Sequence, residues 1–310
     1  MRRLLVLSCL VALASAAPAA ASEAFSDRNV RNPKLQVNGK GEALVTYTRA
    51  DGSPRRVLIW GAVNARHPSS DVPQVRFKHD YAGGWGKYRK LTWRTFRNAC
   101  RPYDGPPLPY LVTACKAPDG SYWALQRWQR TQALLGFDPW LPEHTAWELH
   151  VSHWTGPLAQ LEVSTNWTYG GGHQGVFGRL TYLGQPVHGF GSSPTGNPKD
   201  RYSRNVYIDT FDSVYGAGWR RESGILTHRP TGTFCHSFVP QRPFPGYPTR
   251  AMRPAAPGKK YRVTVMGPGV TPVVAWEGAG LGRFDPARDG ELNRLFDRVM
   301  AGDAICAPER

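Results

Sequence analysis

Alternation of apolar and polar residues with period two dominates the chain after its N-terminal segment and predicts many short β-strands. Ala43, Val45 and Tyr47 share one face of such a strand. Residues 57–63 form a continuous apolar run, which is typical of a strand buried on both faces. Further strands are expected at residues 75–78, 91–94, 122–128, 176–183, 205–211, 233–239, 261–266 and 272–276.

Turn-forming clusters, such as residues 51–54, 170–172 and 267–269, separate these predicted strands. Residues 122–128 fit a strand or a helix, and the turn at residues 118–120 favours the strand. The sequence therefore predicts an all-β fold, a large antiparallel β-sandwich or jelly-roll-like unit with long loops, and not a parallel α/β sheet.

One amphipathic helix is predicted at the C-terminal end, over residues 289–301, with Asp289 as its N-cap and Gly302 as its stop. Its apolar face, which we expect to pack on the body of the protein, holds Leu292, Leu295, Phe296, Val299 and Met300. A membrane-surface helix is the alternative, but the opposite face mixes acidic and basic side chains and is not basic.

The first residues predict export. Arg2 and Arg3 precede the apolar residues 4–17, and Ala19 to Ala21 supply the small residues of a cleavage site. We expect residues 1–21 to be a secretory signal peptide and the mature protein to be secreted or envelope-associated, without a transmembrane segment. Residues 22–310 then form one β-rich domain, or two lobes at 22–137 and 144–310. An uncleaved membrane anchor is the disfavoured alternative, because the apolar run is short.

Four cysteines remain after the expected cleavage, and an even number in an exported chain predicts two disulfides. Sequence proximity favours the pairs Cys100–Cys115 and Cys235–Cys306. Cys235 next to His236 also has the composition of a nucleophile and base, but the disulfide explains this cysteine better. The spacing of Cys and His residues matches no structural zinc site, and the sequence predicts no metal and no cofactor.

Residues 145–167 hold the most informative pair of predicted strands, with a turn at residues 155–157. If the strands form a hairpin around this turn, Leu149 faces Val163, so the apolar sides of the two strands agree. A slip by one residue would turn the apolar side chains of one strand to the polar face, and the register should therefore be strongly specified.

The same register brings candidate catalytic residues together. His150 lies opposite Glu162, and Glu148 lies beside them, with facing side chains about 5 Å apart at Cβ. Carboxylates next to an imidazole suit acid/base chemistry or metal binding. The competing interpretation is an outer sheet face that carries a solvated His–Glu pair.

A second set of candidates lies between residues 207 and 221. Asp209 shares a strand face with aromatic residues, and a glycine-rich turn leads to Trp219 and Arg220. An aspartate near tryptophan and arginine is a common composition of sugar-binding sites, and it is also common in turns. Asp209 is a candidate catalytic residue and Arg220 a candidate ligand-binding residue.

A basic and aromatic stretch, residues 85–97, is the third candidate. Its residues proposed for ligand binding are Trp85, Lys87, Tyr88, Arg89, Lys90 and Trp93. Mixed cations and aromatic rings suit an anionic polymer, and nucleic acid is not excluded. The alternative is a strand with its aromatic residues in the core and its cations at the rim.

The formal net charge of +16, or +14 after loss of Arg2 and Arg3 with the signal peptide, favours an anionic partner or reflects composition alone. Nucleophile-elbow, zinc-protease and P-loop motifs are absent from the sequence. We therefore expect a non-catalytic binding or envelope-associated protein for an anionic glycan, such as an acidic polysaccharide or cell-wall polymer. The alternative is a secreted glycan-cleaving hydrolase or lyase.

Overall fold

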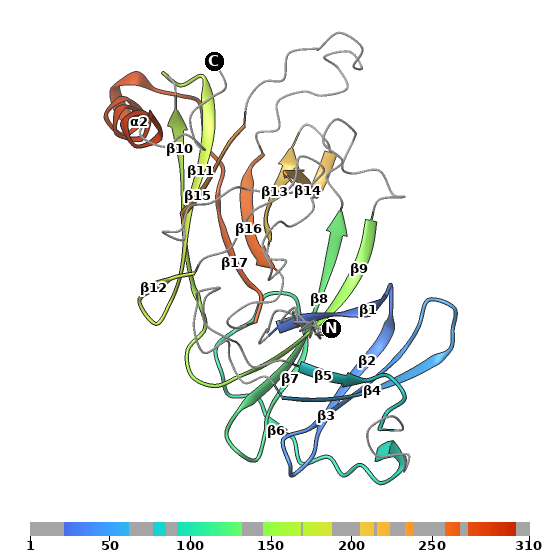
Figure 1. Cartoon of the computed structure of the whole chain (residues 1–310). Helices are drawn as coiled ribbons and strands as arrows, with labels where there is room; N and C mark the ends of the chain where they lie inside the picture. The colour runs from blue at the N-terminus through green and yellow to red at the C-terminus, as the bar shows by residue number, and fades with distance from the viewer. Residues whose placement is uncertain are drawn as a thin grey trace, which may run out of the picture.

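The computed structural model is an all-β molecule followed by the C-terminal helix α2 (Pro286–Ala301), as the sequence predicts (Figure 1). It describes residues 22–61, 77–84, 92–131, 145–168, 170–187, 205–213, 216–223, 233–238, 258–266 and 272–301. The signal peptide predicted for residues 1–21 lies outside the described residues. None of the helices in the described ranges has the length and apolar character that a membrane span requires.

Two antiparallel sheets are built from the first half of the chain. Sheet A has the strand order β1-β9-β8-β7-β6, and sheet B the order β2-β3-β4-β5. The strands of sheet A are β1 (Ser22–Arg28), β6 (Arg101–Pro102), β7 (Leu111–Lys116), β8 (Tyr122–Thr131) and β9 (Thr145–Trp154). The strands of sheet B are β2 (Arg31–Val37), β3 (Ala43–Thr48), β4 (Pro54–Gly61) and β5 (Phe77–Asp80).

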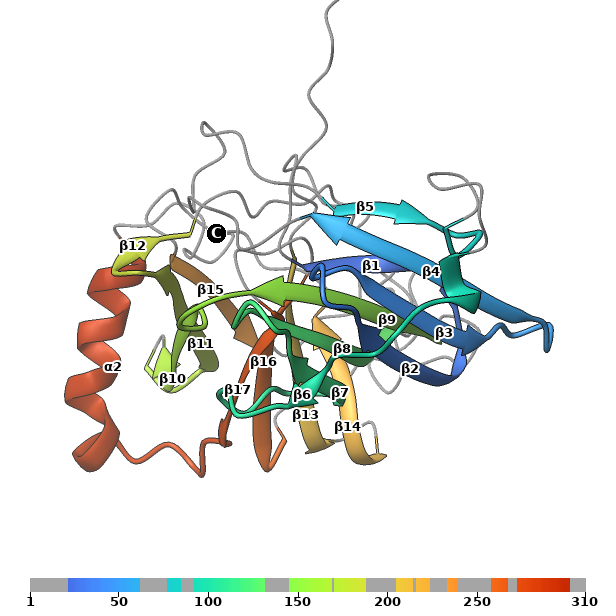
Figure 2. The ribbon, with the colours of Figure 1, turned by 90° about the horizontal axis from the view of Figure 1, so that it is seen from below.

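Two more antiparallel sheets follow. Sheet C has the order β10-β11-β12, with β15 also paired to β11, and sheet D has the order β14-β13-β16-β17. The strands of sheet C are β10 (Gln160–Thr168), β11 (His173–Tyr182), β12 (Gln185–Pro186) and β15 (Thr233–Phe238). The strands of sheet D are β13 (Asn205–Ser213), β14 (Gly216–Ser223), β16 (Lys260–Met266) and β17 (Val274–Ala279). Figure 2 shows α2 beside sheet C at one side of the molecule, sheets D and A in the middle, and sheet B at the other side.

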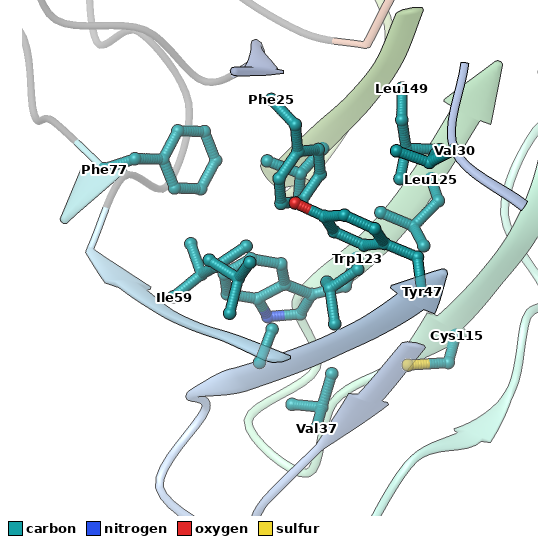
Figure 3. Close-up of a cluster of buried hydrophobic side chains, with 14 of the residues drawn as sticks. Phe25, Val30, Val37, Tyr47, Ile59, Phe77, Cys115, Trp123, Leu125 and Leu149 are labelled. Atoms are coloured by element: carbon teal, nitrogen blue, oxygen red, sulfur yellow. The ribbon is translucent and has the colours of Figure 1, made fainter. Parts of the chain in front are cut away.

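The first core lies between sheets A and B (Figure 3). Tyr47 of β3 enters it together with Ala43 and Val45, as their alternation predicts, and meets Trp123 and Leu125 of β8. Burial of each large apolar side chain stabilises the fold by about 1.5–3 kcal/mol. In β4, residues 57–59 have no exposed surface, so the prediction of burial on both faces is confirmed for this part of the run, whereas Trp60 is half-buried and Gly61 is exposed.

The second core lies between sheets C and D. Val176 and Leu180 of β11 and Phe234 of β15 pack there with Val206 and Ile208 of β13. The two sandwiches are joined where the second face of sheet A meets sheet D. The ring centroids of Trp128 and Tyr207 are 4.8 Å apart across this joint.

The predicted hairpin over residues 145–167 is wrong. Strand β9 pairs with β8 on one side and β1 on the other, while β10 pairs with β11 in sheet C. Leu149 therefore packs in the first core, and Val163 packs against the second. The segment between β9 and β10 carries the chain from one sandwich to the other instead of turning it back on itself.

The helix α2 begins before the predicted start. Pro286 occupies its first turn, where a missing backbone N–H costs nothing, and the Asp285 carboxylate caps the Ala287 amide at 3.0 Å. Asp289, the predicted N-cap, instead accepts a hydrogen bond of 2.9 Å from the backbone amide of Asp285. The expected packing of Leu292 and of Leu295, the next apolar residue on that face, is also wrong, because both are exposed.

The strand predicted for residues 91–94 is also wrong, because residues 92–94 form a short 3-10 helix, η1 (Thr92–Arg94). None of its residues is buried. The described part of the basic and aromatic stretch therefore lies in a surface connection and not in the core of a sheet.

Candidate functional site

The residues proposed for catalysis lie in three different sheets. Glu148 and His150 are on β9 of sheet A, Glu162 is on β10 of sheet C and Asp209 is on β13 of sheet D. The cross-strand partner of Glu162 is Arg179 and not His150. The predicted three-residue cluster is thus reduced to the pair on β9.

Glu148 and His150 form a buried pair. The distance between His150 Nε2 and Glu148 Oε2 is 3.5 Å, and Arg28 Nε lies 3.8 Å from the other carboxylate oxygen. His150 is 2% exposed, and Gln126 of β8 lies opposite it in the sheet. Throughout the described ranges, His, Cys, Asp and Glu side chains form no group of three that could hold a metal ion. Burial keeps this pair away from a polymeric substrate.

Asp209 is buried, and the arginine opposite it is already engaged by other side chains. In the register of sheet D it lies opposite Arg262, whose guanidinium sits 3.9 Å above the ring of Trp219. Arg262 also forms an ion pair of 2.7 Å with Glu277. This surface has the aromatic and polar composition of a sugar site. The charge of Arg262, however, is already paired with Glu277. Arg220 is opposite Thr210 in the strand register, and its side chain lies outside the described part.

The basic and aromatic stretch is described only in its second half. Residues 85–91, and with them Trp85, Lys87, Tyr88, Arg89 and Lys90, lie outside the described residues. Trp93 is half-buried in η1. The guanidinium carbon of Arg56 lies 4.0 Å from its ring centroid, and that of Arg94 lies 5.2 Å away. We call Arg56, Trp93 and Arg94 the Trp93 cluster.

Glycine makes the close approach of Trp93 possible. The Trp93 amide donates a hydrogen bond of 3.2 Å to the carbonyl of Gly83, which has a φ of 67°. A Cβ at Gly83 would lie 3.2 Å from Trp93 Cδ1 and 3.1 Å from Arg56 Cβ. A side chain there would crowd both residues and would be strained at this φ, so the glycine is part of the cluster's construction.

The segment that follows Trp93 is fixed to the first sandwich. Asn98 Oδ1 accepts hydrogen bonds of 3.1 Å from the amides of Val37 and Cys100. The Ala99 amide donates to the Val37 carbonyl at 2.7 Å. The Cys100–Cys115 disulfide is confirmed, with a Cα–Cα distance of 5.6 Å, whereas Cys306 and the side chain of Cys235 lie outside the described part. Trp93 is therefore presented from an anchored loop.

The arginines of the Trp93 cluster carry charge that no carboxylate offsets within the described ranges. Arg56, Arg94 and the exposed Arg97 form no ion pair there. Arg55, next to Arg56, is by contrast paired with Asp27 at 3.3 Å. Guanidinium groups beside an exposed indole face can pair with carboxylate or phosphate while the ring stacks on an apolar surface.

Sequence reasoning missed Arg56 because it lies far from Trp93 along the chain. The available signal was its position directly before the buried run of β4, where alternation sends Arg55 and Arg56 to opposite faces. Nothing in the sequence indicated that η1 would fold back onto this strand.

Comparisons with known proteins identify no similar protein. No family model matches the chain, and neither a curated protein nor a solved structure matches it. The functional argument therefore depends on the residues of the Trp93 cluster and their surroundings.

Proposed function

We propose that this protein is an exported, non-catalytic binding protein that recognises an anionic polymer outside the cell, such as an acidic polysaccharide or a cell-wall polymer. The observation that supports it best is the Trp93 cluster, where two guanidinium groups without carboxylate partners among the described residues flank a half-exposed indole. The formal net charge of +16 favours association with polyanions over its whole surface.

A glycan-cleaving enzyme has weaker support. The candidate carboxylates and histidine are distributed over sheets A, C and D, and the one pair that the fold brings together, Glu148 and His150, is buried. Glycosidic bond cleavage by two carboxylates requires both groups within reach of one bond, at most about 10 Å apart. The Trp93 cluster requires no such arrangement to bind a polymer.

The test is retention on immobilised polygalacturonate, with immobilised dextran as the neutral polymer. A variant carrying Arg56→Gln, Arg94→Gln and Arg97→Gln should lose most of its retention on polygalacturonate. The matched control replaces three exposed cations of β2 and the following turn, Arg31, Lys34 and Lys40, with glutamine, which changes the net charge equally. Equal loss in both triple variants would show that only overall charge matters and would reject the cluster as the site.

Trp93→Ala separates stacking from charge. Loss of the ring should weaken binding by roughly 1 kcal/mol or more, the range known for nucleic-acid bases stacked on aromatic residues. This part of the affinity should persist at high salt, whereas the arginine part should decrease steeply with salt. Thermal melts check that each variant is folded. Tighter binding to single-stranded DNA than to polygalacturonate would indicate nucleic acid as the partner and reject the glycan.

A further inference from the structure

His153 of β9 uses both of its ring nitrogens, one toward sheet B and the other within sheet A. It is 4% exposed, and its Nδ1 lies 3.0 Å from the carbonyl oxygen of Gly61, at the end of β4. Its Nε2 lies 2.8 Å from Ser121 Oγ, in the turn before β8. The Ser121 hydroxyl in turn donates a hydrogen bond of 2.6 Å to Asp119 Oδ1. Gly61, His153, Ser121 and Asp119 therefore form one chain of three hydrogen bonds.

Counting protons determines the charge of this chain. A carbonyl oxygen only accepts, so His153 Nδ1 must carry a hydrogen to bond Gly61. The Ser121 hydroxyl has one hydrogen, which it gives to Asp119, so its bond with His153 Nε2 must use a hydrogen on that nitrogen. Both ring nitrogens are thus protonated. A neutral imidazole could complete the three bonds only if Asp119 were protonated.

The surroundings place the proton on the imidazole and not on the carboxyl. Burial opposes ionisation of Asp119, but hydrogen bonds from the Ser121 side chain and backbone hold its pKa below the ordinary value. The indole of Trp123 is stacked on the imidazole, with ring centroids 4.0 Å apart and planes inclined by 14°. An aromatic face stabilises a cation above it.

Other charged groups near this chain have partners of their own, including Arg101 of β6, which donates hydrogen bonds of 2.9 and 3.3 Å to the carbonyls of Ala117 and Pro118. On β4, Arg55 pairs with Asp27 and Arg56 lies over Trp93. On β7, Lys116 pairs with Asp104 at 2.8 Å.

Two further titratable groups, Glu42 and His79, belong to sheet B and its turns. Glu42, in the turn whose Gly41 approaches Asp119, accepts a hydrogen bond of 3.0 Å from Asn38. His79 of β5 is separated from His153 by the rings of Phe77 and Trp123. In this chain of hydrogen bonds, Asp119 is the carboxylate that is linked to His153, through Ser121.

We propose that His153 is an imidazolium at neutral pH and forms a pH-sensitive clasp between the two sheets of the first sandwich. The folded protein then holds the second ring proton more tightly than the unfolded chain does. The stabilisation that His153 contributes is present while Asp119 is ionised, and it is lost as the pH rises through the point where the folded protein releases this proton. Above this pH, one of the three hydrogen bonds has no hydrogen.

The test is nitrogen NMR of the histidine rings in the intact wild-type protein. His153 is recognised by its proton–proton contacts with Trp123, and both of its ring nitrogens should have the chemical shifts of protonated nitrogens at pH 7. His79, whose pKa burial lowers to about 4, should show one unprotonated nitrogen in the same spectrum and serves as the internal control. An unprotonated nitrogen in His153 at pH 7 would overturn the proposal.

A second measurement uses Asp119→Asn, which keeps the size of the side chain and its accepting oxygen but removes its charge. The pH at which His153 releases its second proton should fall by about one unit or more, because the opposite charge that favours it is gone. An unchanged release point in this variant would show that Asp119 does not hold the proton and would overturn the clasp.

Discussion

The side-chain amide of Gln126 is hydrogen-bonded to both backbone groups of Val273. Gln126 Nε2 donates to the Val273 carbonyl at 3.0 Å, and the Val273 amide donates to Gln126 Oε1 at the same distance. The same Nε2 also donates to the Pro109 carbonyl at 2.8 Å. Gln126 therefore acts as a segment of backbone in the joint between sheet A and sheet D.

Gln126→Ala should destabilise the protein by about 2–4 kcal/mol, because it leaves buried backbone groups of Val273 without a partner. Chemical denaturation followed by tryptophan fluorescence measures this loss. The matched control is Gln185→Ala, at an exposed glutamine of β12, which should change the free energy of unfolding by less than about 0.5 kcal/mol. Equal effects of the two substitutions would refute the bridging role.

Removal of the Cys100–Cys115 disulfide should destabilise the protein by about 3 kcal/mol, since it closes a loop of 15 residues. The double variant Cys100→Ala and Cys115→Ala tests this pair alone, whereas a reducing agent would also act on any Cys235–Cys306 bond. Denaturant titrations of the wild type and of the double variant measure the difference in their free energies of unfolding. The variant should also bind polygalacturonate less tightly, because the loop that carries Trp93 loses one anchor.

Stability should decrease in acid because of His79. Burial lowers its pKa from the ordinary 6.5 to about 4, so the unfolded chain takes up a proton below about pH 6.5, while the folded protein does so only below about pH 4. The fold therefore loses about 3 kcal/mol as the pH falls from 6.5 to 4. His79→Phe, among the rings of Phe25, Phe77 and Tyr81, should flatten the dependence of the melting temperature on pH in this window. A slope identical to the wild type would exclude His79 as its source.

Gly178→Ala should destabilise the second sandwich by about 1–3 kcal/mol. The ring of Phe234, its partner across β11 and β15, covers Gly178 so closely that an added Cβ would lie 1.9 Å from the ring. Gly39→Ala is the control, because a Cβ there meets nothing within 4 Å. If both variants melt at the wild-type temperature, the ring of Phe234 does not cover Gly178 as described.

Local patterns predicted the strands far better than their partners. The alternation in residues 43–47 and the continuous run from residue 57 correspond to β3 and β4, because burial on one or both faces leaves a direct mark on the sequence. The strands β9 and β10 were also recognised. Their apolar positions also agree with each other, so the pattern could not exclude a hairpin between them.

The candidate site was predictable only in part, for a related reason. The composition of residues 92–97 pointed to Trp93 and its basic neighbours, but Arg56 joins them only because Gly83 and Gly84, with positive φ, bring β5 and η1 together. The pair of Glu148 with His150 followed from their spacing on one strand. The inclusion of Glu162 depended on a partner strand, which neighbouring residues do not specify.

The position of β1 has a consequence for the order of folding. Ser22 pairs with Ser152 of β9, so the first described strand completes the edge of a sheet whose neighbouring strand comes much later in the chain. Closing so long a loop costs chain entropy before the contacts that stabilise it have formed. Such non-local pairing slows the folding of all-β proteins. We expect sheet B and the β7–β8 hairpin to form early, and β1 to remain without its strand partner until β9 has joined β8.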